Sequence, residues 1–363
     1  MIDYFSATFP LIIHEDDFEL KIIEDVVTMI SKFLGFTKDE VSKNEFAQNR
    51  FQYQYTIGED ITLRLGGPRL TSGYKSCSIE LKGHGCRSFE NHNTTKTWED
   101  LFEFFLVRLN SNVTRLDIAV DDYDGKHLTI NQIKDKLDKK LFTTNFKIKD
   151  YTLFSSSKGM TLQFGSRTST QMLVIYEKLK EQLSQGIAVP EKYWTRFEMR
   201  FYQDKAYNIV MNVIKKQLNL RQYVFALLYE MLDIKAKSNY NEHNMHKAPT
   251  NPKWKRFLQG VEKAKIEKYK VRKSTHETYS KWATPLAALY FLDIFSHKHF
   301  DLEATFIELV KIAIQAIDDI NANKIKKINR FLKESGLKKI SLLELEDAKN
   351  KLETYIQISE LPF

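Results

Sequence analysis

Alternation of apolar and polar side chains at period two, in the first two hundred residues, constrains the fold of this chain more than any other feature. In the segment 115–121, Arg115 and Asp117 alternate with Leu116 and Ile118. Such alternation is typical of an antiparallel strand with one buried face. Nine segments are predicted as strands, several of which alternate in this way: Tyr4–Phe9, Arg50–Ile57, Ile61–Leu65, Cys77–Lys82, Val113–Val120, Tyr151–Ser155, Met160–Phe164, Met172–Tyr176 and Trp194–Phe201.

Helical periodicity is rare in this part of the chain and dominates after it. Two helices are predicted among the strands, at Phe18–Phe33 and Trp98–Leu109. The polar segment Ser238–Pro252 carries two prolines and is predicted as a loop or linker. Further helices are predicted at Tyr207–Leu218, Leu220–Met231 and Phe300–Phe331, and after Ser341, where Glu344 completes a capping-box pattern. We therefore expect an α+β fold, with an antiparallel-sheet domain in residues 1–205 and a mostly helical domain in residues 206–363.

Charge and composition narrow the class of protein. The chain of 363 residues has 55 Lys and Arg against 47 Asp and Glu, which gives a net charge of +8 and favours a polyanionic partner. Two cysteines exclude a disulfide framework and a four-thiolate zinc site. The sequence has no signal peptide and no apolar run of about 18 residues, so we expect a cytoplasmic protein without a membrane partner. The phosphate-binding motif of ATPases is also missing.

Much of the positive charge lies in one stretch, residues 247–282. This stretch has eleven Lys or Arg against three Glu, interleaved with Trp254, Phe257, Tyr269 and Trp282. Cations attract a phosphate backbone and aromatic rings stack on bases, so DNA contact is the favoured interpretation. A solvated helix face with a few core aromatics is the alternative.

Three carboxylates lie within predicted strands, each between apolar neighbours. They are Glu80, Asp117 and Glu198. A buried carboxylate is costly unless it is paired or bound to a metal. Salt bridges to Arg115, Arg196 or Arg200 would satisfy these carboxylates, and so would a hard cation, because oxygen ligands suit Mg²⁺ or Mn²⁺. The residues alone leave both possibilities open.

Histidines and one tyrosine are the remaining candidates for chemistry. His297 and His299 form an H-x-H pair, but they lie beside a predicted helix, where residues two apart point in different directions. Tyr176 ends an apolar strand and is followed at once by Glu177 and Lys178. By itself, such a tyrosine is usually an aromatic at the rim of a sheet.

An ordered set of motifs resembles one family of proteins. The resemblance begins at Asp3-Tyr4-Phe5-Ser6 and covers roughly residues 1–205. It continues through Glu80 with Gly83-His84-Gly85-Cys86-Arg87, Thr114–Asp121, Leu162–Arg167, Ile175-Tyr176-Glu177-Lys178 and Trp194–Glu198, with a weaker feature at Pro252–Leu258. The chain resembles the replication initiation factor family, Rep_trans, of rolling-circle plasmids, phages and integrative elements, which includes the MOBT relaxases.

The resemblance implies a sheet-based nicking domain, distantly like the His-metal relaxases but without their H-x-H motif. It implies that Tyr176 is the nucleophile and that Glu80, Asp117 and Glu198 bind the metal. One departure is Glu177, where relatives commonly have Asn or Asp, and we assign this residue no role.

The expected reaction is metal-assisted transesterification on single-stranded or hairpin origin DNA, with Mg²⁺ or Mn²⁺ as cofactor. Attack by Tyr176 would leave a 5′-phosphotyrosine and a free 3′-hydroxyl, with no need for ATP. Activation of the tyrosine could come from the metal, a carboxylate or Lys178. The cations expected to contact DNA are Arg115, Arg167, Lys178, Arg200, Lys253, Lys255 and Arg256.

The residues also fit other functions, some with the same nicking chemistry and some without it. A conjugative relaxase uses the same chemistry as a replication initiator, and both would recruit a host helicase. A homodimer fits initiators, although no coiled-coil pattern supports one. A non-catalytic DNA-binding regulator is the alternative of another class. A tyrosine recombinase is disfavoured, because it would need its tyrosine near the C-terminus on a helical domain.

Overall fold

The computed structural model divides the chain into two compact units, residues 1–68 with 74–271, and residues 69–73 with 272–363. It contains no helix, among the residues described, that is long and apolar enough to cross a membrane. The described residues are 2–12, 19–67, 69–71, 74–148, 150–157, 159–166, 168–237, 239–269, 291–318, 320, 324–326, 329 and 339–359.

One large antiparallel sheet forms the first unit, in the order β2-β3-β4-β6-β1-β7-β12-β11-β10-β9. All of its pairs are antiparallel, and its middle strands are long. Strands β1, β7 and β12 come from distant parts of the sequence but lie side by side. The bounds are β1 Ile2–Ile12, β2 Val41–Lys43, β3 Tyr53–Ile57, β4 Ile61–Leu65, β6 Tyr74–Leu81, β7 Asn112–Asp122, β9 Thr152–Ser156, β10 Gly159–Phe164, β11 Gln171–Glu177 and β12 Thr195–Tyr202.

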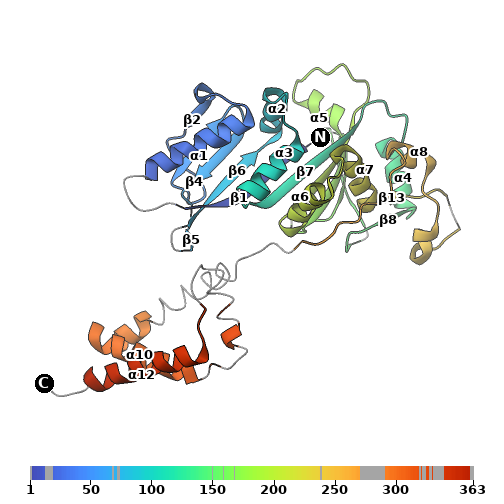
Figure 1. Cartoon of the computed structure of the whole chain (residues 1–363). Helices are drawn as coiled ribbons and strands as arrows, with labels where there is room; N and C mark the ends of the chain where they lie inside the picture. Colours follow the sequence, from blue (N-terminus) through green and yellow to red (C-terminus); the bar gives the residue numbers. More distant parts are fainter. Residues whose placement is uncertain are drawn as a thin grey trace. The chain divides into compact units, whose positions relative to one another are not determined.

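Helices cover one face of this sheet, where α1, α3, α6 and α7 lie together (Figure 1). The strands turn their large apolar side chains toward them. Phe5 of β1 lies 5.7 Å from Phe102 and 5.8 Å from Phe105, measured between ring centroids. Apolar residues recur every third or fourth position in these helices, which places their apolar stripe on the sheet. The bounds are α1 Glu19–Leu34, α2 Gly83–His92, α3 Trp98–Glu103, η2 Phe104–Arg108, α4 Ile130–Asp138, α5 Lys178–Ser184, α6 Asp204–Lys216, α7 Leu220–Met231, η3 Glu242–Lys247 and α8 Pro252–Phe257.

The other face of the central strands is polar, because side chains alternate along each strand. Register places Leu116 beside Phe5 on the helical face, and Arg115 beside Ser6 on the polar face. The two faces of β7 therefore separate the hydrophobic core from a row of charged groups.

All nine predicted strands are present, with ends that differ by a few residues. The α+β class is confirmed. The structure adds short elements that have weak patterns in the sequence, among them α2, α4 and a two-stranded sheet of β8 (Phe142–Thr144) and β13 (Leu232–Ile234).

Helices of the second unit are described by themselves. Helix α10 (Leu302–Asp318) packs against α12 (Leu342–Ser359), with Phe306 and Tyr355 in edge-to-face contact at 5.9 Å. Part of the predicted helix Phe300–Phe331 lies outside the described residues.

The boundary between the two compact units lies later in the sequence than the change from strands to helices near residue 205. Helix α6 packs against β7 and β12, and the first unit extends to Val271. Helices α6, α7 and α8 therefore belong to the same compact unit as the sheet. The functional division at residue 205, into a nicking part and a DNA- or partner-binding part, stays a prediction.

Two aromatics of the basic stretch belong to the core, which corrects their interpretation as base-stacking groups. Trp254 is fully buried, and its indole N–H donates to the Leu232 carbonyl oxygen at 3.1 Å. Phe257 is also buried, and both rings pack within 5.5 Å of Phe197 on the helical face. Trp282 lies outside the described residues.

We expect Trp254→Ala to lower the free energy of unfolding by about 3–5 kcal/mol, because it opens a cavity and leaves a carbonyl unpaired. Lys255→Ala, one residue along on the exposed side of the same helix, should change it by less than about 0.5 kcal/mol. Urea unfolding followed by circular dichroism measures both. Equal effects of the two changes would contradict the core assignment.

Candidate active site

The candidate nucleophile lies in a cross-strand row on the polar face. Tyr176 of β11 is directly opposite Arg196 of β12, which is opposite Asp121 of β7. Residues paired in this way point to the same side of the sheet. The Arg196 guanidinium holds both Asp121 carboxylate oxygens, at 2.8 and 3.0 Å, and the Trp194 indole N–H donates to one of them. A fixed cation therefore stands beside the tyrosine.

The Tyr176 hydroxyl is available. Within the described part of the chain it has no hydrogen-bond partner, and it is not among the buried polar atoms left unpaired. Burial of the ring raises the pKa of Tyr176 above its ordinary value, and the negative charge of Glu198 raises it further, while Arg196 lowers it. The phenol therefore stays protonated at neutral pH, so attack by its oxygen requires a base or an added positive charge.

Two of the three predicted metal ligands are neighbours on this face. Glu198 lies diagonally across from Asp117, since Arg200 is the residue directly opposite Asp117. Arg115 contacts both Asp117 oxygens, at 3.0 and 2.6 Å, and Arg200 contacts Glu198 at 2.7 Å. Burial raises the pKa of Asp117 to about 6 against the opposing effect of Arg115, and the charge of Glu198 adds to the rise.

Glu80 lies farther away, in β6, with β1 between it and β7. The Tyr4 hydroxyl donates to one of its oxygens and Arg64 contacts the other at 3.1 Å. Burial opposes ionisation, but these hydrogen bonds outweigh it and hold the pKa of Glu80 below its ordinary value. The Arg115 guanidinium stacks on the Tyr4 ring at 4.1 Å and connects this group to Asp117.

A bulge in β1 brings one more carboxylate to this face. Asp3 is the extra residue where the β1–β7 register shifts between Ile2 and Tyr4. Its carboxylate lies 3.5 Å from Arg196. Local sequence patterns assign no role to Asp3, Tyr4 or Arg64, because their contacts depend on strand register. The pattern Asp3-Tyr4 at the start of a strand was the only signal.

The donor chemistry fits a hard cation, but each of the three carboxylates already holds an arginine. Glu80 and Glu198 are three strand spacings apart, at about 4.8 Å each. No three His, Cys, Asp or Glu side chains gather around a common point within the described ranges. Asp117 and Glu198 are therefore the two candidate ligands that the fold brings together.

The cations predicted to contact DNA fall on two sides of the sheet. Arg115 and Arg200 share the face of Tyr176, and the Lys178 ammonium lies 5.8 Å from the centroid of the Tyr176 ring. Arg167 lies outside the described residues.

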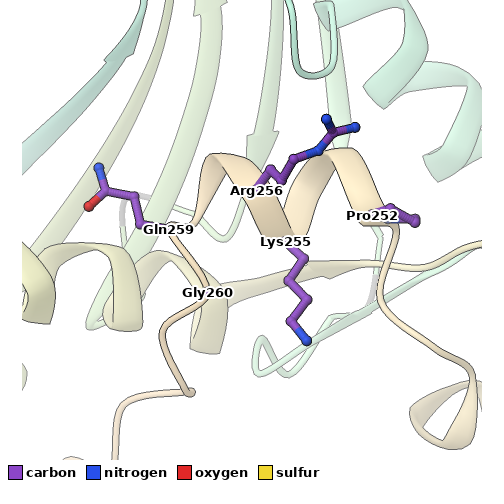
Figure 2. A pocket seen from close by; sticks show the side chains of 5 residues that line it. All are labelled: Pro252, Lys255, Arg256, Gln259 and Gly260. Carbon is purple, nitrogen blue, oxygen red and sulfur yellow. The ribbon is translucent and has the colours of Figure 1, made fainter.

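Lys253, Lys255 and Arg256 extend from α8, which packs on the helical face. They are exposed and have no ion-pair partner in the part of the chain that is described. Figure 2 shows Lys255 and Arg256 pointing in opposite directions beside a hollow of about 520 Å³, lined also by Pro252, Gln259 and Gly260. No carboxylate or tyrosine lines this hollow, so it is separate from the chemistry of the polar face.

Sequence comparison assigns the family. Residues 111–299, just over half of the chain, match the model described as replication initiation factor. The chain belongs to this family. Residues 1–105 also match the N-terminal domain of rolling-circle replication initiation proteins.

Two relatives illustrate the similarity. The putative DNA relaxase NicK of Bacillus subtilis (strain 168) is 28% identical over 230 residues, which cover 61% of this chain and 60% of that protein. A rolling-circle replication initiator structure from Geobacillus stearothermophilus matches with a TM-score of 0.56 and 24% identity, over 74% of this chain and 98% of that one. At this identity the structural match supports the fold alone.

We expect Asp117 to make stability fall as pH rises. Its folded pKa of about 6 lies above the unfolded value of about 3.9, so the native state binds the proton more tightly. Its stabilising contribution is complete below about pH 4 and lost above about pH 6, a change of about 2–3 kcal/mol. Asp117→Asn removes this slope. Urea unfolding from pH 4 to 7 in EDTA measures it, and parallel curves for the two proteins would contradict the assignment.

Proposed function

We propose that this chain is a rolling-circle replication initiator that nicks one strand of origin DNA through Tyr176. The observation that carries the proposal is the Tyr176 hydroxyl, which has no partner within the described part of the chain and lies on the polar face beside the Arg196–Asp121 pair. Membership of the replication initiation factor family supports it. The reaction is transesterification: the phenolic oxygen attacks the scissile phosphorus, and the 3′-oxygen leaves as a hydroxyl.

Activation of the phenol is the main chemical requirement. Glu198 raises the pKa of Tyr176 by its charge, and it lies diagonally across from Tyr176 on the same face, where it is a candidate to accept the proton. Arg196 is held in place by Asp121, so it can face a non-bridging phosphate oxygen without a change of rotamer. The covalent phosphotyrosine conserves the phosphodiester bond for later rejoining.

Asp117 and Glu198 would hold a divalent cation, Mg²⁺ or Mn²⁺, and Glu80 is the third predicted ligand. Bound there, such an ion supplies a Lewis acid for the scissile phosphate and positive charge that offsets Glu198. The arginines that pair with these carboxylates would then be released to contact DNA phosphates. Arg115 and Arg200 are suited to this exchange, because each has a partly exposed side chain.

The partner of this face is single-stranded or hairpin origin DNA. The unpaired cations of α8 lie on the opposite side of the sheet, where they could hold flanking duplex. A host helicase and a second copy of the chain belong to the same proposal, as does action in the cytoplasm.

A conjugative relaxase is the second candidate, supported by the similarity to the putative relaxase NicK. A coupling ATPase encoded beside the gene would favour transfer over replication. A DNA-binding regulator without catalytic activity is the alternative from another class of function. The absence of nicking activity on cognate DNA would favour it.

We expect the intact protein to form a covalent adduct with supercoiled DNA of the element that encodes it, in Mg²⁺ or Mn²⁺. Tyr176→Phe should abolish the adduct, because it removes the attacking oxygen. Denaturing electrophoresis of protein bound to labelled DNA measures both.

Tyr4→Phe is the matched control, since Tyr4 lies on the same face with its hydroxyl bonded to Glu80. Its adduct should persist. An adduct that survives Tyr176→Phe and disappears with Tyr4→Phe would move the nucleophile to Tyr4. A cognate origin that gives neither nick nor adduct would favour the regulator.

Metal binding has its own readout, apart from nicking. We expect Asp117→Asn and Glu198→Gln each to weaken Mn²⁺ binding by about tenfold or more, followed by the free-ion signal in electron paramagnetic resonance. Asp124→Asn, an exposed carboxylate outside this face, should bind as the intact protein does. Unchanged Mn²⁺ binding in Asp117→Asn and Glu198→Gln would show that these residues are not metal ligands. Loss of Mn²⁺ binding in Glu80→Gln would show that Glu80 is the third ligand.

A further inference from the structure

One exposed aromatic side chain lies in line with the candidate nucleophile. Phe154 of the edge strand β9 is directly opposite Thr161 of β10, and Thr161 is directly opposite Tyr176. Directly paired residues share a face, so Phe154 and Tyr176 point to the same side of the sheet. They are two strand spacings apart, about 10 Å.

Phe154 is the most exposed large apolar residue among the described side chains of this sheet. Its side chain is 53% exposed, and its ring contacts no other ring within the described residues. Tyr123, which is 48% exposed on the same face, stacks instead on Trp194 at 5.2 Å. An exposed apolar ring on an edge strand also carries a risk of strand-to-strand association, which natural sheets usually avoid.

The neighbourhood of the ring fits single-stranded DNA. Along this row of strands, Thr161, a small polar residue, lies between Phe154 and Tyr176, and Arg196 lies beyond Tyr176. The Lys178 ammonium, which pairs with Glu181, lies 5.8 Å from the centroid of the Tyr176 ring. A strand whose scissile phosphate sits at Tyr176 would therefore meet cations on one side and an open aromatic ring on the other. Aromatic rings stack on bases of any sequence, whereas the phosphates require positive charge.

We propose that Phe154 stacks on a base close to the scissile phosphate and positions the single strand for attack by Tyr176. This inference rests on the proposed function for the choice of the reacting phosphate. The binding of a single strand by Phe154, by contrast, can be tested without nicking. Phe154 is a positioning residue, because it does not touch the reacting atoms.

The test compares two ligands and two neighbouring positions. The probes are fluorescein-labelled twelve-nucleotide thymidine DNA and the same length of abasic DNA, which keeps the phosphates and lacks the bases. Affinity is measured by fluorescence anisotropy in EDTA. Leu153→Ala is the matched control, because Leu153 is 41% exposed on the same edge strand and points to the other face.

Phe154→Ala is expected to weaken thymidine DNA binding on the order of tenfold and to leave abasic binding unchanged. Phe154→Trp is expected to keep the affinity, and Leu153→Ala to stay within about twofold of the intact protein. Equal losses on both probes, or equal losses for Phe154→Ala and Leu153→Ala, would overturn the stacking role. Circular dichroism of each variant shows whether its fold is intact.

Failure of this inference and failure of the proposed function give different results. If the intact protein forms the Tyr176 adduct and Phe154→Ala binds both probes normally, the nicking function stands and the stacking role fails. If Phe154→Ala loses base-dependent binding but no adduct forms with cognate DNA, the stacking role stands and the nicking function fails. At saturating origin DNA, Phe154→Ala should still form the adduct, with the loss confined to the apparent KM.

Discussion

Charge compensation across the central strands is the interaction on which the rest of the polar face depends. Buried carboxylates destabilise a fold unless each has a partner, and here arginines on the same or adjacent strands supply them. Asp117 is paired with Arg115, Glu198 with Arg200, and Asp121 with Arg196. The alternation of the strands keeps these groups away from the hydrophobic core, so the sheet can place charge at its centre.

The same pairing prepares the face for chemistry. A carboxylate held by an arginine has a fixed position, but burial still raises the pKa of Asp117, because Arg115 offsets only part of the cost of desolvation. In the proposed function, an anionic DNA strand would compete for the arginines and a cation would compete for the carboxylates. Each ligand would then lower the free-energy cost of binding the other.

The sheet was predictable from the sequence, because period-two alternation is local information. Glu80, Asp117, Tyr176 and Glu198 were placed on strands for the same reason. Two of their partners were also predicted, because Arg115 and Arg200 lie two residues along the same strand from Asp117 and Glu198. The Tyr4 partner of Glu80 was not predictable, since strand pairing brings it from 76 positions away. The bulge at Asp3 depends on the register of β1 with β7, and the neighbours of Tyr176 depend on the register of β11 with β12. A shift of one residue in a strand would move its side chains to the other face.

Helix α8 shows where pattern alone misleads. Trp254 and Phe257 are three residues apart, with Pro252 at the first helical position and the Asn251 side chain as cap. This spacing predicts a short helix with one buried face. It is equally typical of aromatic residues interspersed among cations in a nucleic-acid-binding segment. The cations of this helix stay exposed while its aromatic rings are buried, so the two kinds of side chain have different roles.

Strand β9 shows the reverse case. Phe154 has few cations nearby in sequence, and only the register through Thr161 brings it into line with Tyr176. Position in the sheet is therefore a better guide to a base-binding ring than the charge of its sequence neighbours.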